Sequence, residues 1–119
     1  VLFSMYAEFF ALQKHSNHYV RRVQNYIQTM YMYPLRVEQM AQMVNLDRRY
    51  LSRVFKEKLG CSIQEYLVRV RMEQAKICLQ NGSSVAQTAR LCGYDDVCNF
   101  SKMFKRYAGV SPNAWRGEI

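Results

Sequence analysis

Two stretches of this sequence repeat each other, and the repeat limits the possible fold more than any other feature. A shift of 48 residues, which becomes 49 after one inserted residue, aligns these identical pairs: Val37/Val85, Gln39/Gln87, Ala41/Ala89, Asp47/Asp95, Ser52/Ser101, Phe55/Phe104, Lys56/Lys105, Gly60/Gly109 and Ser62/Ser111. Each copy has a short amphipathic stretch, a tight turn at Asn45 or Gly93, an aspartate suited to cap a helix, and a longer basic helix. That order is a helix-turn-helix, so we expect two such motifs.

The other segments also have helical periodicity. Apolar residues recur every three or four positions over residues 18–32, and this helix should end before Pro34. Ser62 and Glu65 form a capping-box sequence, which predicts a helix of about 18 residues that ends at Gln80. Only two prolines and five glycines occur, and no segment alternates like a strand. We therefore predict an all-α, homeodomain-like fold of seven helices, in which a long central helix joins two helix-turn-helix units.

This pattern also predicts how the chain is organised. We assign the chain to four segments: residues 1–17 as the end of a linker or the connection to a missing N-terminal domain, 18–61 as the first helix-turn-helix subdomain, 62–80 as the connecting helix, and 81–119 as the second helix-turn-helix subdomain. Residues 1–14 are rich in apolar side chains. They either connect to another domain or form a hydrophobic helix that packs on the first subdomain.

The longer basic helix of each copy has an inner and an outer stripe. At about 100° per residue, the inner stripes comprise Leu51, Val54, Phe55 and the stem of Lys58, and Phe100, Met103, Phe104 and Tyr107. The outer stripes comprise Arg49, Ser52, Arg53 and Lys56, and Cys98, Ser101, Lys102 and Lys105. Core packing does not require polar residues to recur on the outer side. The outer stripes therefore predict a binding surface.

The charge of the chain is compatible with a polyanionic partner. The formal net charge is +8, from 17 basic and 9 acidic residues, and all the basic residues lie from Lys14 onward. A solvated basic surface is the alternative explanation, and charge alone does not decide between the two.

The segments RRYLSRVFKEKLG (48–60) and GYDDVCNFSKMFKRYAGVSPNAWR (93–116) together resemble the AraC/XylS family of bacterial transcription regulators. The resemblance covers about residues 18–117. It implies that two recognition helices enter successive major grooves of double-stranded DNA. A connector of ~18 residues is ~27 Å long, which approaches the ~34 Å of one DNA turn once the flanking units are added.

The resemblance also implies a cellular role. The chain would regulate bacterial transcription as an activator in the cytoplasm, with double-stranded DNA and RNA polymerase as partners. The full-length protein would carry an N-terminal effector or dimerisation domain. A helical protein-interaction module that docks an acidic partner on the basic stripes is the alternative function.

Specific residues on each recognition helix correspond to the DNA contacts of the family. Base contacts are expected from Arg49, Ser52 and Arg53 in the first copy, and from Cys98, Ser101 and Lys102 in the second. Phosphate contacts are expected from Arg36, Arg48, Lys56, Lys105 and Arg106. Arginine pairs well with guanine O6 and N7, and phosphate binding is the alternative for Arg49 and Arg53. Cys98 replaces Arg49 in the second copy, and Val97 lies either at the core edge or at the DNA. We therefore expect the first helix to supply most of the direct specificity.

Enzymatic, metal-binding and membrane functions have no support in the sequence. His15 and His18 lack an obvious third ligand, and the four cysteines contain no C-x-x-C pair. We expect reduced thiols, no cofactor, no metal and no catalytic residue. No apolar run approaches the ~20 residues of a membrane span.

Overall fold

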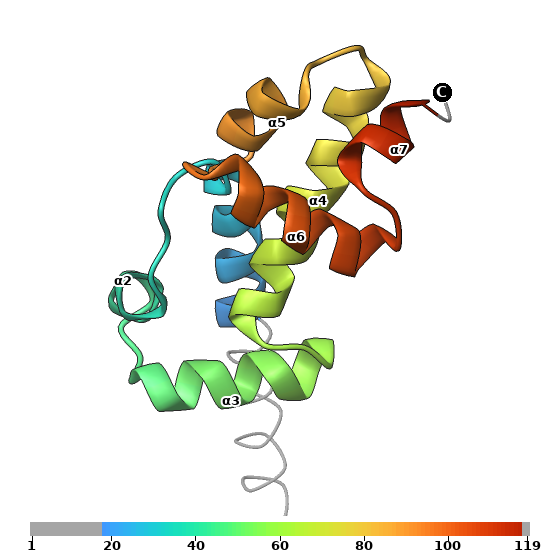
Figure 1. The fold of residues 1–119 in the computed structure, drawn as a ribbon. Coiled ribbons are helices and arrows are strands. Elements are labelled where there is room, and N and C mark those ends of the chain that lie inside the picture. The colour runs from blue at the N-terminus through green and yellow to red at the C-terminus, as the bar shows by residue number, and fades with distance from the viewer. Residues whose placement is uncertain (1–17, 118–119) are drawn as a thin grey trace, which may run out of the picture. The chain divides into compact units, whose positions relative to one another are not determined.

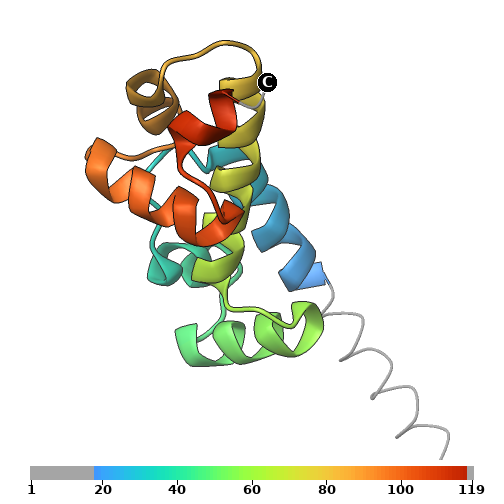
Figure 2. The same cartoon turned by 45° about the vertical axis from the view of Figure 1, so that its right-hand side comes forward.

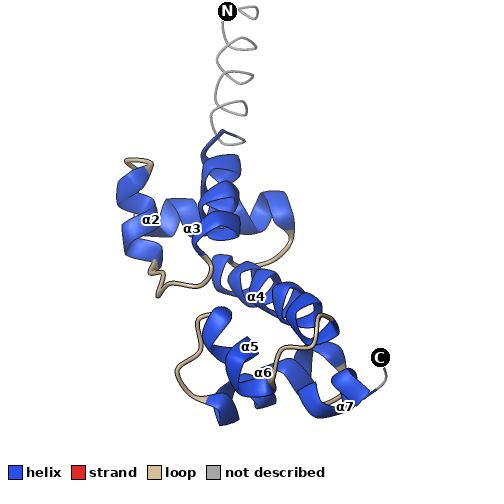
Figure 3. Ribbon diagram, turned by 90° about the horizontal axis from the view of Figure 1, so that it is seen from above, coloured by secondary structure: helices blue, strands red, loops and turns tan. Residues whose placement is uncertain are grey.

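The computed structural model describes residues 18–117, and every regular element within that range is a helix (Figure 3). The helices are residues 18–30, α2 (Val37–Met43), α3 (Arg48–Leu59), α4 (Ile63–Gln80), α5 (Val85–Leu91), α6 (Val97–Ala108) and α7 (Pro112–Gly117). The prediction of an all-α fold with seven helices is confirmed for the described residues. The predictions made for residues 1–17 lie outside them.

The described chain forms two compact units. The first holds residues 18–29 and 35–64, and the second holds residues 30–34 and 65–117. The short stretch 30–34 thus belongs to the second unit, although both of its neighbours in the sequence belong to the first.

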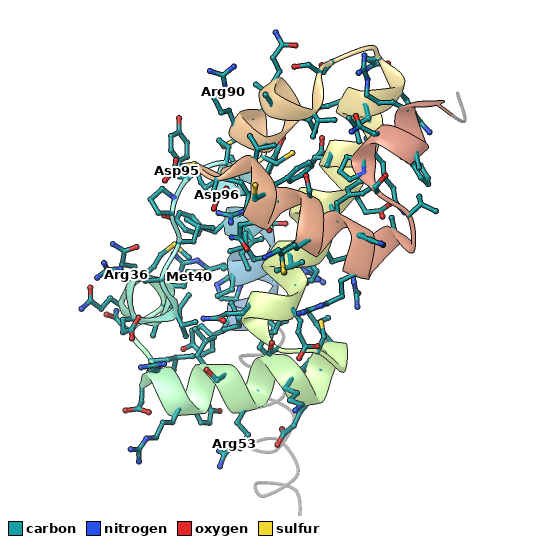
Figure 4. The ribbon with its side chains drawn as sticks, in the orientation of Figure 1. Arg36, Met40, Arg53, Arg90, Asp95 and Asp96 are labelled. Carbon is teal, nitrogen blue, oxygen red and sulfur yellow. The ribbon has the colours of Figure 1, made fainter. Side chains whose placement is uncertain are left out.

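The first unit packs three helices around a small apolar core. Val23, Ile27, Leu51 and Phe55 are fully buried, because the helical repeat places their side chains on the inner side of residues 18–30 and of α3. Met40 extends from α2 toward this interior in Figure 4. α2 contacts α3 and is seen almost along its axis in Figure 1, where α3 runs across the view. Because these residues pack in the core, the opposite side of α3 faces solvent.

The second unit has an aromatic core. Figure 2 shows α5, α6 and α7 gathered around the C-terminal part of α4. Phe100 and Phe104 are fully buried, with ring centroids 5.9 Å apart. Tyr94 lies 5.6 Å from Phe100, and Trp115 of α7 meets Phe104 edge-on at 6.1 Å. Such aromatic contacts add to the stability gained from burial.

Backbone hydrogen bonds show where the repeat carries its inserted residue. The turns have equivalent bonds 48 positions apart: the N–H groups of Asn45 and Leu46 donate to the carbonyls of Gln42 and Ala41, and those of Gly93 and Tyr94 donate to Arg90 and Ala89. The helix caps, however, are 49 positions apart. Asp47 accepts from the Arg49 N–H at 2.8 Å, and Asp96 accepts from the Cys98 N–H at 2.9 Å. The inserted residue is therefore Asp95.

The predicted pairing of Asp47 with Asp95 is consequently wrong. Asp96, not Asp95, caps the second helix, and α6 begins at Val97. The Asp96 carboxylate accepts from an N–H that has no partner within the helix, as an N-cap does.

Two inner-stripe residues are more exposed than their buried neighbours. Lys58 is exposed as a whole residue. Tyr107 is 38% exposed, and its hydroxyl donates to Glu73 Oε2 of α4 at 2.8 Å. Lys76 Nζ lies 3.0 Å from the same oxygen and 5.0 Å from the Tyr107 ring centroid. A polar contact with α4 therefore replaces burial at the end of α6.

Candidate nucleic-acid interface

The outer stripe of α3 faces solvent, as its periodicity predicts. Arg49, Arg53 and Lys56 are exposed and Ser52 is half-buried, whereas the inner residues Leu51, Val54 and Phe55 are buried. In Figure 4, Arg53 projects away from the body of its own unit. Three basic side chains and one hydroxyl therefore share one accessible side of a single helix.

Two arginines of α3 have contacts that the sequence analysis did not include. The Arg53 guanidinium carbon lies 5.4 Å from the ring centroid of Tyr50, a cation–π distance. Arg48 Nη1 lies 2.8 Å from Glu38 Oε1 of α2, and both side chains are more than half exposed. The spacing of three residues between Tyr50 and Arg53 is a sequence signal for the first contact. The second joins two helices and has no local signal.

A hollow of about 230 Å³ adjoins the outer stripe of α3 in the first unit. Its lining residues are Val37, Arg48, Ser52, Ser62, Ile63 and Gln64. The hollow brings predicted DNA contacts of α3 beside the first residues of α4. Arg36, another predicted phosphate contact, is exposed at the N-cap position of α2.

The outer stripe of α6 is also accessible, but its chemistry differs. Cys98 and Lys102 are exposed, and Ser101 is half-buried. Lys105 and Arg106 are exposed near the C-terminal end of the helix. The basic side chains thus lie away from the first turn of α6.

The start of α6 is apolar and acidic. Val97 is 38% exposed, so it lies outside the core. Asp95 and Asp96 are exposed immediately before it and are labelled in Figure 4. α3 carries five basic residues and one acidic residue, whereas α6 carries three basic residues and follows two aspartates. The two outer stripes therefore present unequal positive charge.

The described part of the chain has neither a metal-ligand cluster of three or more side chains nor a helix long and apolar enough to span a membrane. All four cysteines are free thiols. Burial, reinforced by the neighbouring Cys78, raises the pKa of the Cys92 thiol to about 12. Cys92 therefore stays protonated at neutral pH and is a poor nucleophile.

Comparison with known proteins is consistent with this geometry. Residues 40–118 match the family model described as a helix-turn-helix domain. The chain is 39% identical over 102 residues to the Msm operon regulatory protein of Streptococcus mutans serotype c. The aligned region covers 85% of this chain and 37% of that protein. The chain therefore spans little more than a third of that relative's length.

Solved structures show the same fold. The C-terminal domain of AraT, a response regulator from Geobacillus stearothermophilus, has a TM-score of 0.82 and 37% identity, with 85% of each chain covered. The DNA-binding domain of AdpA, a global transcriptional factor solved in complex with a target DNA, has a TM-score of 0.79 and 26% identity. That match covers 83% of this chain and 90% of the other.

Proposed function

The chain belongs to the AraC/XylS family of helix-turn-helix transcription regulators, and from that premise we propose that α3 and α6 enter successive major grooves of a specific DNA site. The observation that carries the proposal is the exposed polar stripe on each of these helices, opposite a buried core. Such a stripe can enter a groove without disturbing the core. In this proposal the 18-residue α4 is the connector between the two motifs, and the two grooves are one DNA turn apart.

We assign most of the base recognition to α3. Arg49 and Arg53 have the fork of donors that matches guanine O6 and N7, and Ser52 lies between them. Tyr50 supports this assignment for Arg53, because the ring restricts the guanidinium before DNA binds. A restricted side chain loses less conformational freedom on binding.

We assign a smaller share of recognition to α6, through Cys98, Ser101 and Lys102. The Cys98 thiol is small and weakly polar, so it suits a thymine methyl better than a hydrogen-bonded contact. The exposed Asp95 and Asp96 add negative charge beside this end of the helix, which disfavours a close phosphate.

Phosphate contacts complete the interface. We propose Arg36, Arg48, Lys56, Lys105 and Arg106 for this role, because all five are exposed basic side chains. Arg48 would exchange Glu38 for a phosphate. An exposed ion pair contributes only about 0–1 kcal/mol, so this exchange costs little.

We further propose that the chain activates bacterial transcription in the cytoplasm, in contact with RNA polymerase. Residues 1–17 would lead to an N-terminal effector or dimerisation domain, and residues 18–61, 62–80 and 81–119 would act as first motif, connector and second motif. A promoter–reporter fusion tests activation: expression should rise when the chain is produced and the operator lies upstream. Falling expression with that arrangement would contradict activation.

Selection of bound sequences from random duplex DNA tests the DNA-binding model. We expect a bipartite site with half-sites about one helical turn, ~10 base pairs, apart. The logarithm of the binding constant should fall steeply with salt, by about 0.9 per neutralised phosphate. A single half-site would contradict the two-groove model, and a shallow slope without site preference would favour a protein-interaction module.

The same selection measures the inequality of the two helices. Arg53→Ala should relax base preference at one half-site by about 1–3 kcal/mol, and Lys102→Ala should relax the other by less. Lys58→Ala is the matched control on α3, because it removes one exposed charge from the inner stripe. If Lys102→Ala relaxes base preference more than Arg53→Ala, the assignment is wrong.

A further inference from the structure

Arg71 of α4 lies where three segments of the second unit meet. Its Nε donates to the carbonyl of Tyr31 at 2.8 Å, and its Nη2 donates to the carbonyl of Tyr33 at 2.9 Å. Its guanidinium carbon lies 5.2 Å from the ring centroid of Tyr94, in the turn before α6. One side chain thus joins α4, the stretch 30–34 and the turn of the second motif.

The backbone at this meeting point is closely packed. Gly93 has a φ of +93°, and a Cβ there would lie 3.0 Å from the Met32 carbonyl oxygen and 3.1 Å from both the Tyr31 carbonyl oxygen and Arg71 Nη2. The turn therefore rests directly on the stretch that Arg71 holds. Only a residue without a side chain allows this approach.

The chemistry of Arg71 suits fixation rather than DNA binding. A guanidinium presents several donors in a rigid plane, so it can bond two carbonyls and stack on a ring at once. Here both carbonyls and the ring belong to the protein. A lysine at this position would keep the charge but has no planar fork that fits two fixed carbonyls.

A chain of contacts leads from Arg71 to the second recognition helix. Tyr94 is buried and packs on Phe100, with ring centroids 5.6 Å apart. Phe100 lies on α6 between the exposed Cys98 and the half-buried Ser101. A shift of Tyr94 would therefore change how α6 is seated and where its outer stripe points.

We propose that Arg71 is a positioning residue for the second recognition helix. It holds stretch 30–34 and Tyr94 together, and through Tyr94 it fixes the orientation of α6. The proposal rests on the proposed function, since it supposes that α6 contacts bases. It predicts that loss of Arg71 weakens recognition of the α6 half-site and leaves recognition of the other half-site unchanged.

The test compares wild-type chain with Arg71→Lys and Arg71→Ala on three duplexes. One is the selected bipartite site, and the others have one half-site scrambled in turn. The half-site whose preference changes in Lys102→Ala is assigned to α6. We expect Arg71→Lys to weaken binding to the intact site about tenfold, as for one lost base contact. That loss should vanish on the duplex whose α6 half-site is scrambled.

Three results would overturn the proposal. Wild-type affinity in Arg71→Lys would show that the fork is not needed. A loss equal on all three duplexes would indicate a general role in folding. A salt slope shallower by about 0.9 in Arg71→Ala and restored in Arg71→Lys would identify a phosphate contact. Failure of the proposed function is separable, because it would appear as the lack of a bipartite site for the wild-type chain.

A second variant keeps the test informative if Arg71 variants do not fold. Tyr94→Leu removes the ring that Arg71 stacks on and keeps an apolar side chain at this buried position. We expect the same loss confined to the α6 half-site. Trp115 fluorescence reports whether the second unit is folded, since it is the only tryptophan and packs on Phe104. Uniform loss in a folded Tyr94→Leu chain would also overturn the proposal.

Discussion

Replacing Gly93 with alanine should destabilise the second unit through two separable effects. The first is backbone strain, because φ is +93° and a left-handed conformation costs an L-residue about 1–2 kcal/mol. The second is steric. The new Cβ would lie 3.0–3.1 Å from two carbonyl oxygens and a guanidinium nitrogen, and relieving such overpacking costs about 1–3 kcal/mol. We expect a total loss of roughly 2–5 kcal/mol.

Gly109→Ala is the matched control for the strain. Gly109 lies in the same unit with a φ of +84°, but a Cβ there would have no atom within 4 Å. This variant should therefore lose only the backbone contribution, about 1–2 kcal/mol. The difference between the two variants measures the contact of the turn with stretch 30–34.

Urea unfolding followed by Trp115 fluorescence measures both losses. The single tryptophan lies in the second unit, so the signal reports on the unit that carries both glycines. The free energy of unfolding follows from linear extrapolation, with similar slopes required for the three proteins. If Gly93→Ala and Gly109→Ala lose the same free energy within about 0.5 kcal/mol, the close approach at Gly93 contributes nothing and the reasoning is refuted.

Three further predictions concern the second unit. Asp96→Ala should cost about 1 kcal/mol of unfolding free energy as a lost N-cap, whereas urea unfolding of Asp95→Ala should match wild type; equal losses would contradict the assigned cap. The hydrogen bond from Tyr107 and, to a lesser extent, the contact with Lys76 lower the pKa of Glu73. The contact therefore contributes its full stabilisation at pH values above the ordinary carboxyl pKa. This stabilisation is lost as the pH falls through the lowered pKa. Tyr107→Phe should therefore cost about 0.5–1 kcal/mol at pH 7 and lose less stability on acidification, and an unchanged acid dependence would argue against the contact. The exposed Cys98 should be alkylated before the buried cysteines in mass-spectrometric labelling of the folded chain; faster labelling of a buried thiol would contradict the packing.

Local periodicity was sufficient to predict most of the fold. Helices and outer stripes depend on spacings of three and four residues, which the sequence displays directly. The position of the insertion was not predictable in this way. Asp95 and Asp96 are adjacent, and either can cap a helix, so the identical pair at a shift of 48 favoured Asp95. Only the hydrogen bonds of the turn and cap identify Asp96 as the counterpart of Asp47.

Several contacts that were not predicted from the sequence join residues far apart in the chain. Arg71 bonds carbonyls 38 and 40 positions earlier, and Tyr107 bonds a carboxylate 34 positions earlier. Helical periodicity predicts which side of a helix a residue lies on, but it does not predict which distant group a long side chain contacts. Tyr107 was accordingly predicted to be in the core, although its hydroxyl and Lys76 favour the surface of α4.

α3 and α6 have the same length and the same kind of residue at each end, so the exposed residues of one helix can be transferred to the other. Each has twelve residues, starts after an aspartate cap and ends at a left-handed glycine, Gly60 or Gly109. Asp95 lies before the second cap, so a graft between cap and glycine needs no insertion or deletion. The inner residues would have to remain with their own core, and only the outer stripe would be transferred. A chain with the α3 stripe on both helices should then prefer a site in which the same half-site occurs twice.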